Sequence, residues 1–130
     1  MASRSELRER IMTILYQIEM YKKNKFEYNL EDVIHENIEI SNSFVNSIVN
    51  GVLEKEEELD SIANKYLNNW TIDRLDNVGA VILRMGIYEI KYTDTPDIVA
   101  INEAIELAKK YSEENVRKMI NAVLDKVVNE

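Results

Sequence analysis

The only histidine, His35, is where metal or acid–base chemistry would have to start. His35-Glu36 begins like the HExxH helix of a zinc protease, but the second histidine of that motif is replaced by Glu39. Asp32 and His35 have the i, i+3 spacing of a di-iron helix, which also needs a second histidine. The chain has no cysteine, so thiolate sites and disulfides are excluded. We therefore expect no metal site and no cofactor.

No other arrangement of residues favours catalysis. No serine stands in the glycine-flanked turn of a nucleophile elbow. The three glycines lie far apart or within predicted helices, so they cannot form a phosphate-binding loop. Neighbouring carboxylates such as Glu56 and Glu57 fall in a highly charged stretch, where water screens both. We predict a protein that binds and is not an enzyme.

Basic residues near the two ends of the chain are the best candidates for binding a ligand. Arg4, Arg8 and Arg10 cluster in the first turns of a predicted helix, and Arg117-Lys118 lies near the start of the last one. A guanidinium can hold phosphate with two parallel hydrogen bonds and can stack on an exposed base. Single-stranded RNA offers both targets. Such arginines are also commonly solubilising charge, and interleaved acids can pair with them.

The acidic charge of the chain is concentrated in one segment. The formal net charge is −8, and residues 26–60 hold ten acids and one base, so the remainder is close to neutral. Because the Debye length is about 8 Å at physiological salt, phosphate binding depends on local charge. The remainder can carry a small basic patch but not a broad one.

Apolar spacing predicts helices along the whole chain. Three glycines and one proline leave few tight turns, which disfavours a β-sandwich or barrel. Apolar residues recur every three or four positions over 4–22, which predicts an amphipathic helix there. Further helices are predicted near 29–38, from a cap at Ser41 or Ser43 to Leu67 with a bend or break near Gly51, and from Ser112 to Val127.

The segment from Leu75 to Tyr92 is apolar on more than one side, which places its helix at the centre of a bundle. Thr71 with Asp73 marks a helix start before it. Thr95-Pro96 predicts an N-cap followed by proline at the first helical position of the next helix.

The length is typical of one domain, and no linker or internal repeat divides residues 1–130. The N-terminus lacks the apolar stretch of a signal peptide, and no run approaches the roughly 18 apolar residues of a membrane helix. We expect a single-domain cytoplasmic protein that makes no contact with a membrane.

Long ungapped segments carry a family resemblance. They are WTIDRLD, ILRMGIYEI, PDIVAINEAIELAKKY and KMINAVLDK between residues 70 and 127, together with RSELRERIMTILYQIE near the N-terminus. These segments resemble the NusB family of bacterial transcription antitermination factors. The resemblance is weak between residues 23 and 65, where the family itself varies. It implies an all-α fold of about six to seven helices in two packed three-helix bundles.

The resemblance also implies a function. The family pairs with the ribosomal protein NusE, and the pair binds the single-stranded boxA element of nascent RNA. That assembly joins the RNA polymerase antitermination complex and promotes read-through, notably of ribosomal RNA operons. The alternatives are a helical protein–protein adaptor without RNA binding and the detached RNA-binding domain of a ribosomal RNA methyltransferase. A homodimer through the same surfaces is a further expected assembly.

Site residues follow from the resemblance by position. The residues that the resemblance implies for RNA binding are Arg4, Arg8, Asn115, Arg117, Lys118 and Met119. The residues that it implies for NusE binding are Tyr16, Asp76, Gly79 and Arg84. This reading requires the arginines of the first helix and the basic residues of the last to face a common strip of RNA.

Five positions depart from the family pattern, and one of them, Ala122 in place of a usual glycine, is readily accepted by a helix. Ser5 and Glu6 stand where arginine is common, which predicts a weaker hold on phosphate. Met119 replaces a usual phenylalanine, and Gly79 stands where an acidic residue is frequent. We therefore expect weak RNA affinity for the protein alone and tighter, salt-sensitive affinity in the presence of NusE.

Overall fold

The computed structural model describes residues 2–130, and this part of the chain forms seven α-helices and one short 3-10 helix with no strand. The helices are α1 (Arg4–Lys23), α2 (Leu30–Asn37), α3 (Ser43–Glu54), α4 (Glu56–Tyr66), η1 (Ile72–Arg74), α5 (Asn77–Tyr92), α6 (Asp97–Tyr111) and α7 (Glu114–Val128). The predicted all-α fold is confirmed. None of these helices combines the length and the hydropathy needed to cross a bilayer.

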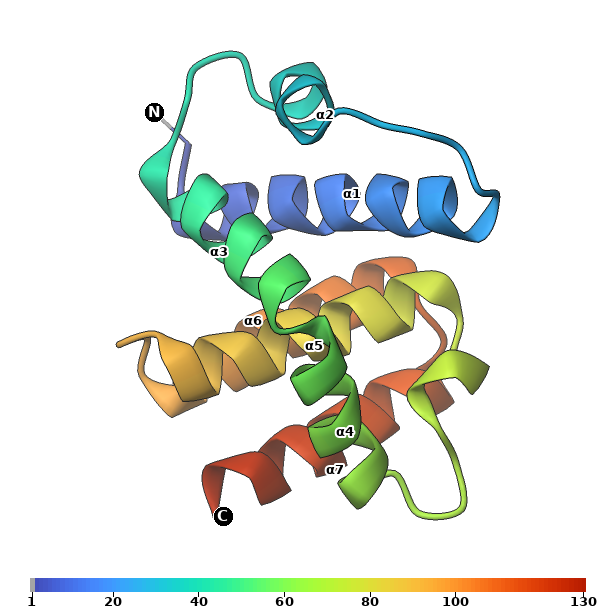
Figure 1. The fold of residues 1–130 in the computed structure, drawn as a ribbon. Helices are drawn as coiled ribbons and strands as arrows, with labels where there is room; N and C mark the ends of the chain where they lie inside the picture. Colours follow the sequence, from blue (N-terminus) through green and yellow to red (C-terminus); the bar gives the residue numbers. More distant parts are fainter. Residues whose placement is uncertain (1) are drawn as a thin grey trace.

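The helices form two bundles. In the first, α2 and α3 pack on α1, and in the second, α5 packs against α4, α6 and α7 (Figure 1). The bundles meet where α1 and α3 contact α5. The predicted two-bundle arrangement is confirmed, with α4 as a fourth member of the second bundle.

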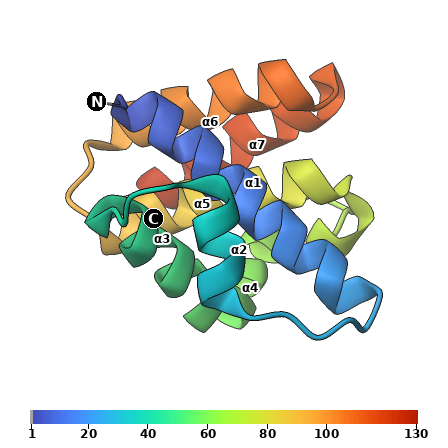
Figure 2. The same ribbon diagram turned by 90° about the horizontal axis from the view of Figure 1, so that it is seen from above.

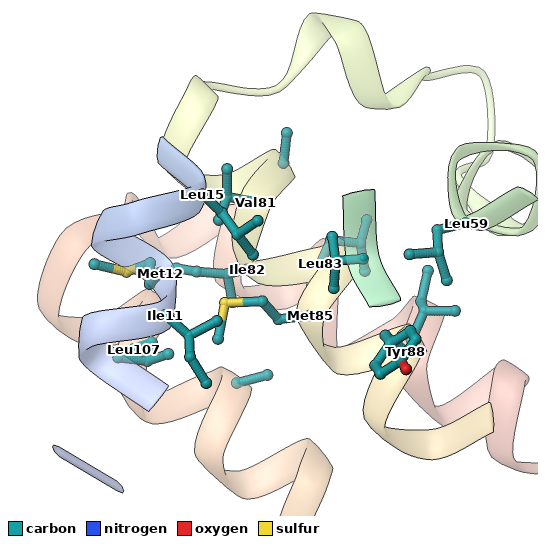
Figure 3. Packing of buried hydrophobic residues seen from close by; sticks show 14 of the residues in the cluster. Ile11, Met12, Leu15, Leu59, Val81, Ile82, Leu83, Met85, Tyr88 and Leu107 are labelled. Atoms are coloured by element: carbon teal, nitrogen blue, oxygen red, sulfur yellow. The ribbon is translucent and has the colours of Figure 1, made fainter. Parts of the chain in front are cut away.

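Helix α5 is the centre of the fold, as its apolar sequence predicted. Every residue from Gly79 to Glu89 is buried. Figure 3 shows Ile82 and Met85 of α5 beside Ile11 of α1 within one continuous core. Because both bundles use α5, the core joins them into a single packed unit.

Gly51 has a different role from the one predicted. Helix α3 continues past it, and the helical run is interrupted instead at Lys55. A Cβ atom at Gly51 would collide with the hydroxyl end of the Tyr88 side chain on α5. The glycine is required for the close crossing of α3 over α5, so the predicted bend is displaced by four residues.

Two helix starts differ from the predicted caps. Asn42 caps α3, because its side-chain oxygen accepts from the backbone N–H of Val45 at 3.1 Å, so neither Ser41 nor Ser43 is the cap. The start predicted at Thr71 produces only the short η1 helix. Helix α5 begins later, after a second cap at Asp76.

Two predicted hydroxyl caps are engaged elsewhere. The Thr95 hydroxyl donates to the Glu89 carboxylate at 3.0 Å, and Pro96 itself is the N-cap of α6. The Ser112 hydroxyl donates to Asp76 at 2.8 Å, and Glu113 is the N-cap of α7. In the first case the carboxylate lies only six residues earlier in the chain, and in the second it lies 36 residues earlier, so neither hydroxyl caps the helix that follows it.

Candidate nucleic-acid interface

Arg4 lies exposed at the start of α1. Ser3 and Glu6 form a capping box there: the Ser3 hydroxyl accepts from the Glu6 N–H at 3.1 Å, and the Glu6 carboxylate accepts from the Ser3 N–H. The Arg4 guanidinium lies over the Phe44 ring, 4.0 Å from its centroid. This cation–π contact orients the guanidinium but uses none of its hydrogen-bond donors, so they remain able to bind phosphate.

Arg8, one turn later, is buried and paired. Its side chain donates two hydrogen bonds to the Glu89 carboxylate, at 2.6 Å from Nε and 2.8 Å from Nη2. The Oε1 atom of Glu103 lies 3.7 Å from Nη1 of Arg8. The hydrogen bonds with Glu89 raise the pKa of Arg8 above its ordinary value. This geometry does not fit the expected phosphate contact, because Arg8 holds α1 against α5 and α6.

The start of α7 carries the second predicted group. Asn115 and Lys118 are exposed, and Arg117 is half-buried. Arg117 and Lys118 approach the Glu114 carboxylate of their own helix at 3.6 Å and 3.5 Å. Surface pairs of this kind contribute about 0.3–0.5 kcal/mol, so a stronger anion can displace them. These cations are available to a ligand.

A depression made of two adjoining hollows, which share Asp76 and Glu113, lies between the start of α7 and α1. Its first part is lined by Trp70, Arg74, Leu75, Asp76, Glu113, Asn115, Val116 and Met119. Its second part is lined by Tyr16, Asp76, Asn77, Val78, Lys110, Tyr111, Ser112 and Glu113. Asp76 and Glu113 line both parts. The structure therefore brings two of the residues predicted for NusE next to two of those predicted for RNA.

Gly79 was predicted at the NusE surface, and the structure places it in the helix packing. It is buried, and a Cβ atom there would lie 2.7 Å from Cγ1 of Val116 and 2.9 Å from the Asp76 carboxylate. The missing side chain lets α5 and α7 approach closely. The position contributes to the shape of the surface beside Asp76 and presents no side chain of its own.

Arg84, also predicted for NusE, is buried in an ion-pair cluster. It donates to Asp60 at 2.7 Å and to Glu19 at 3.3 Å, and Glu56 lies 3.9 Å away. Burial alone would lower the pKa of Arg84, but the hydrogen bond and charge of Asp60, with the two glutamates, more than offset it and the pKa is raised. Arg84 therefore ties α5 to α1 and α4.

Helix α6 separates the two exposed basic groups. Near its middle, Glu103 accepts from the Ser5 hydroxyl of α1 at 2.6 Å, and near its end, Lys110 pairs with Glu9 at 2.8 Å. Figure 2 shows the start of α1 beside the start of α6, and the turn from α6 to α7 at the opposite end. Arg4, at the start of α1, and the cations at the start of α7 therefore form two separate basic groups.

Lys110 and Tyr111, at the end of α6, are residues that sequence reasoning missed. Both contact the Glu9 carboxylate of α1, and these hydrogen bonds lower the pKa of Glu9. Tyr111 and Arg10 also line a hollow on α1 that lies between the two basic clusters. The only local signal was the lysine pair in the last turn of α6, which also suits the helix dipole.

His35 lies exposed on α2. No group of three or more potential metal ligands comes together anywhere in residues 2–130. The binding surface described above is therefore the candidate site of this chain.

Comparison with known proteins decides the family. The NusB family model matches residues 5–129. This chain belongs to the NusB family. The transcription antitermination protein NusB of Macrococcus caseolyticus is 38% identical over 128 residues, which is 97% of this chain and 96% of that relative.

Solved structures agree with the family assignment. NusB of T. maritima has a TM-score of 0.85 and 30% identity, and the match covers 99% of this chain and 92% of that one. A crystal structure of the antitermination factors NusB and NusE in complex with double-stranded RNA contains a chain with a TM-score of 0.80 and 26% identity, matched over 97% of this chain and 96% of that one. The predicted NusB-like fold is confirmed over nearly the full chain.

Proposed function

We propose that this chain is a transcription antitermination factor that binds boxA-type RNA together with NusE, and that it promotes read-through, notably of ribosomal RNA operons. The observation that carries the proposal is at the start of α7. There, within residues 2–130, Arg117 and Lys118 pair only with their own helix, beside a depression that Asn115 and Met119 line. A relative with 38% identity bears the name of an antitermination protein, and a solved NusB complex contains NusE and RNA.

The RNA contacts divide by chemistry. Arg117 and Lys118 bind phosphates at the start of α7, and Arg4 binds a phosphate at the start of α1. Asn115 can hydrogen-bond a base edge, and Met119 provides an apolar surface against a base. Arg8 supports the site indirectly, because its pair with Glu89 holds α1 in place.

NusE occupies the second part of the depression, where Tyr16 and Asp76 lie. Gly79 and Arg84 act there by holding the helices that shape this surface. Because the two parts share Asp76 and Glu113, RNA and NusE bind next to each other. Contact between neighbouring ligands makes each raise the affinity of the other by the same factor.

The protein alone binds RNA weakly. Its two exposed basic groups, at the starts of α1 and α7, are small, and the carboxylates of Glu9 in α1 and Glu113 at the N-cap of α7 lie near them. NusE adds further contacts to the same RNA strand, so the pair binds more tightly. The function is completed when this pair joins the RNA polymerase antitermination complex.

Fluorescence anisotropy with labelled boxA-type RNA tests this proposal. We expect weak binding to the protein alone and at least tenfold tighter binding with NusE, stronger for the unpaired strand than for a duplex. Arg117→Glu with Lys118→Glu should reduce RNA binding while NusE is still captured. Lys65→Glu, an exposed charge reversal on α4, is the matched control.

Two results would contradict the proposal. Equal RNA affinity with and without NusE would remove the linkage between the two sites. NusE capture without RNA binding by the pair would favour the adaptor alternative.

A further inference from the structure

The turn between α1 and α2 exposes aromatic rings. Phe26 is 65% exposed, and Tyr28 is 37% exposed. The Tyr28 ring stacks on Tyr21 at the end of α1, with centroids 5.8 Å apart and planes 13° apart. A phenylalanine exposed to this extent gains little from burial when the chain folds. Its position is therefore better explained by a ligand than by packing.

The backbone of this turn is held in place. The Phe26 N–H donates to the Tyr21 carbonyl at 2.9 Å, and the Lys25 N–H donates to the Lys22 carbonyl at 3.1 Å. Lys25 takes a left-handed conformation with φ of 58°. These contacts direct the Phe26 ring outward, so little ordering is lost when a ligand covers it.

The aromatic turn is basic in an otherwise acidic protein. Residues 20–28 contain three lysines and one acid, whereas the whole chain has a net charge of −8. Lys22 pairs with Glu56 at 3.4 Å, and Lys23 donates to the Asn77 side chain. Within residues 2–130, no carboxylate forms an ion pair with Lys25. Exposed rings beside the unpaired Lys25 match the bases and phosphates of an unpaired strand.

We propose that residues 22–28 bind single-stranded RNA, with Phe26 and Tyr28 each stacking on a base and Lys25 contacting a phosphate. The inference rests on the proposed function and adds a contact for the RNA that continues beyond the boxA element. Lys23 reaches Asn77, which lines the same depression as Asp76 and Lys110. The turn therefore lies beside the part of the depression assigned to NusE, and the RNA would pass the bound NusE to reach it.

A protein surface fits the same turn less well. An apolar partner could cover Phe26, but it would leave the charges of Lys23 and Lys25 without matching groups. RNA satisfies the rings and the cations together, because each nucleotide carries a base and a phosphate.

Anisotropy with two RNAs tests the inference in the presence of NusE. One RNA carries the boxA-type element alone, and the other adds about ten unstructured nucleotides at either end, within the usual site size of single-strand binding surfaces. Phe26→Ala should weaken binding of the extended RNA about tenfold, the effect expected from losing one stacked base, and leave the short RNA unchanged. Lys25→Glu should also weaken binding of the extended RNA, and the loss should be larger at low salt.

Ile40→Ala is the matched control. Ile40 is 81% exposed in the connection between α2 and α3, so its removal deletes an exposed apolar group elsewhere and should change neither affinity. Photo-crosslinking of the extended RNA with 4-thiouridine provides a readout on the wild-type chain. The crosslinked peptide should contain residues 22–28.

The outcomes separate this inference from the proposed function. If Phe26→Ala binds extended RNA as the wild type does, while Arg117→Glu with Lys118→Glu weakens it, the inference is wrong and the proposed function stands. If the wild type with NusE binds neither RNA, both fail. If Phe26→Ala reduces NusE capture and leaves extended RNA unaffected, the turn is a protein contact and the inference is overturned.

Discussion

Arg8 and Arg117 are the same residue type predicted for the same task, and the structure places them in opposite surroundings. Arg8 is 4% exposed and makes two hydrogen bonds to Glu89 of another helix. Arg117 is only half-buried and approaches Glu114, three residues earlier on its own helix, at 3.6 Å. Arg8 therefore stabilises the packing of the helices, and Arg117 is available to bind a ligand.

The difference follows from where the carboxylate partner comes from. Arg84 behaves like Arg8, because Asp60 reaches it from α4. Lys118 behaves like Arg117, because its partner is also Glu114. A partner on a second helix allows both charges to be buried together, whereas a partner on the same helix leaves them in water. Buried pairs are costly to break, and surface pairs are not.

The largest expected effect is on the buried pair. Glu89→Ala leaves the Arg8 charge buried without its main partner, so the free energy of unfolding should fall by about 3 kcal/mol. Glu114→Ala removes the partner of Arg117 and should change the free energy of unfolding by less than about 0.5 kcal/mol. Urea denaturation of the two variants measures both values, and equal losses would contradict the comparison.

The exposed pair should affect binding without affecting stability. Arg117→Ala with Lys118→Ala removes two phosphate contacts, and each contributes about 0.7 to the slope of log K against log salt on a single strand. The slope for boxA-type RNA should therefore fall by about 1.4, with unfolding free energy unchanged within about 0.5 kcal/mol. A salt series in the presence of NusE measures this, and an unchanged slope would place the RNA elsewhere.

The smallest expected effect concerns Glu9, whose carboxylate joins α1 to α6 at the surface. Hydrogen bonds from Lys110 and Tyr111 hold its pKa below the ordinary value of 4.5. Its contribution to stability is therefore present above 4.5 and is lost as the pH falls through the lowered pKa. Glu9→Gln should melt slightly below the wild type at neutral pH, and the difference should shrink in acid.

Thermal melts over a pH series test the Glu9 prediction. Glu106→Gln is the control, because its only ion pair is with Lys109 on the same helix within residues 2–130. A Glu9→Gln difference that stays constant into acid would mean that Glu9 acts through packing alone.

The helices of this chain were largely predictable because their signals are local. Apolar spacing placed α1 to within one residue at its C-terminal end, and the all-round apolar sequence identified α5 as central. The errors came at helix ends. Thr95 was predicted as a cap and Ser112 as a helix start, but Glu89, six residues before Thr95, and the distant Asp76 accept hydrogen bonds from their hydroxyls. Lys110 and Tyr111 were missed because only the crossing of α1 with α6 places them beside Glu9.

The sequence by itself determined the helical elements and the family, because apolar periodicity and long motifs are properties of neighbouring residues. It also predicted a set of arginines able to bind RNA or NusE, but could not tell which of them would be buried in ion pairs. Glu89 lies 81 residues from Arg8, and Asp60 lies 24 residues from Arg84. Only the packing of helices brings these charges together. Tertiary structure therefore decided which cations hold the protein together and which are free to bind a ligand.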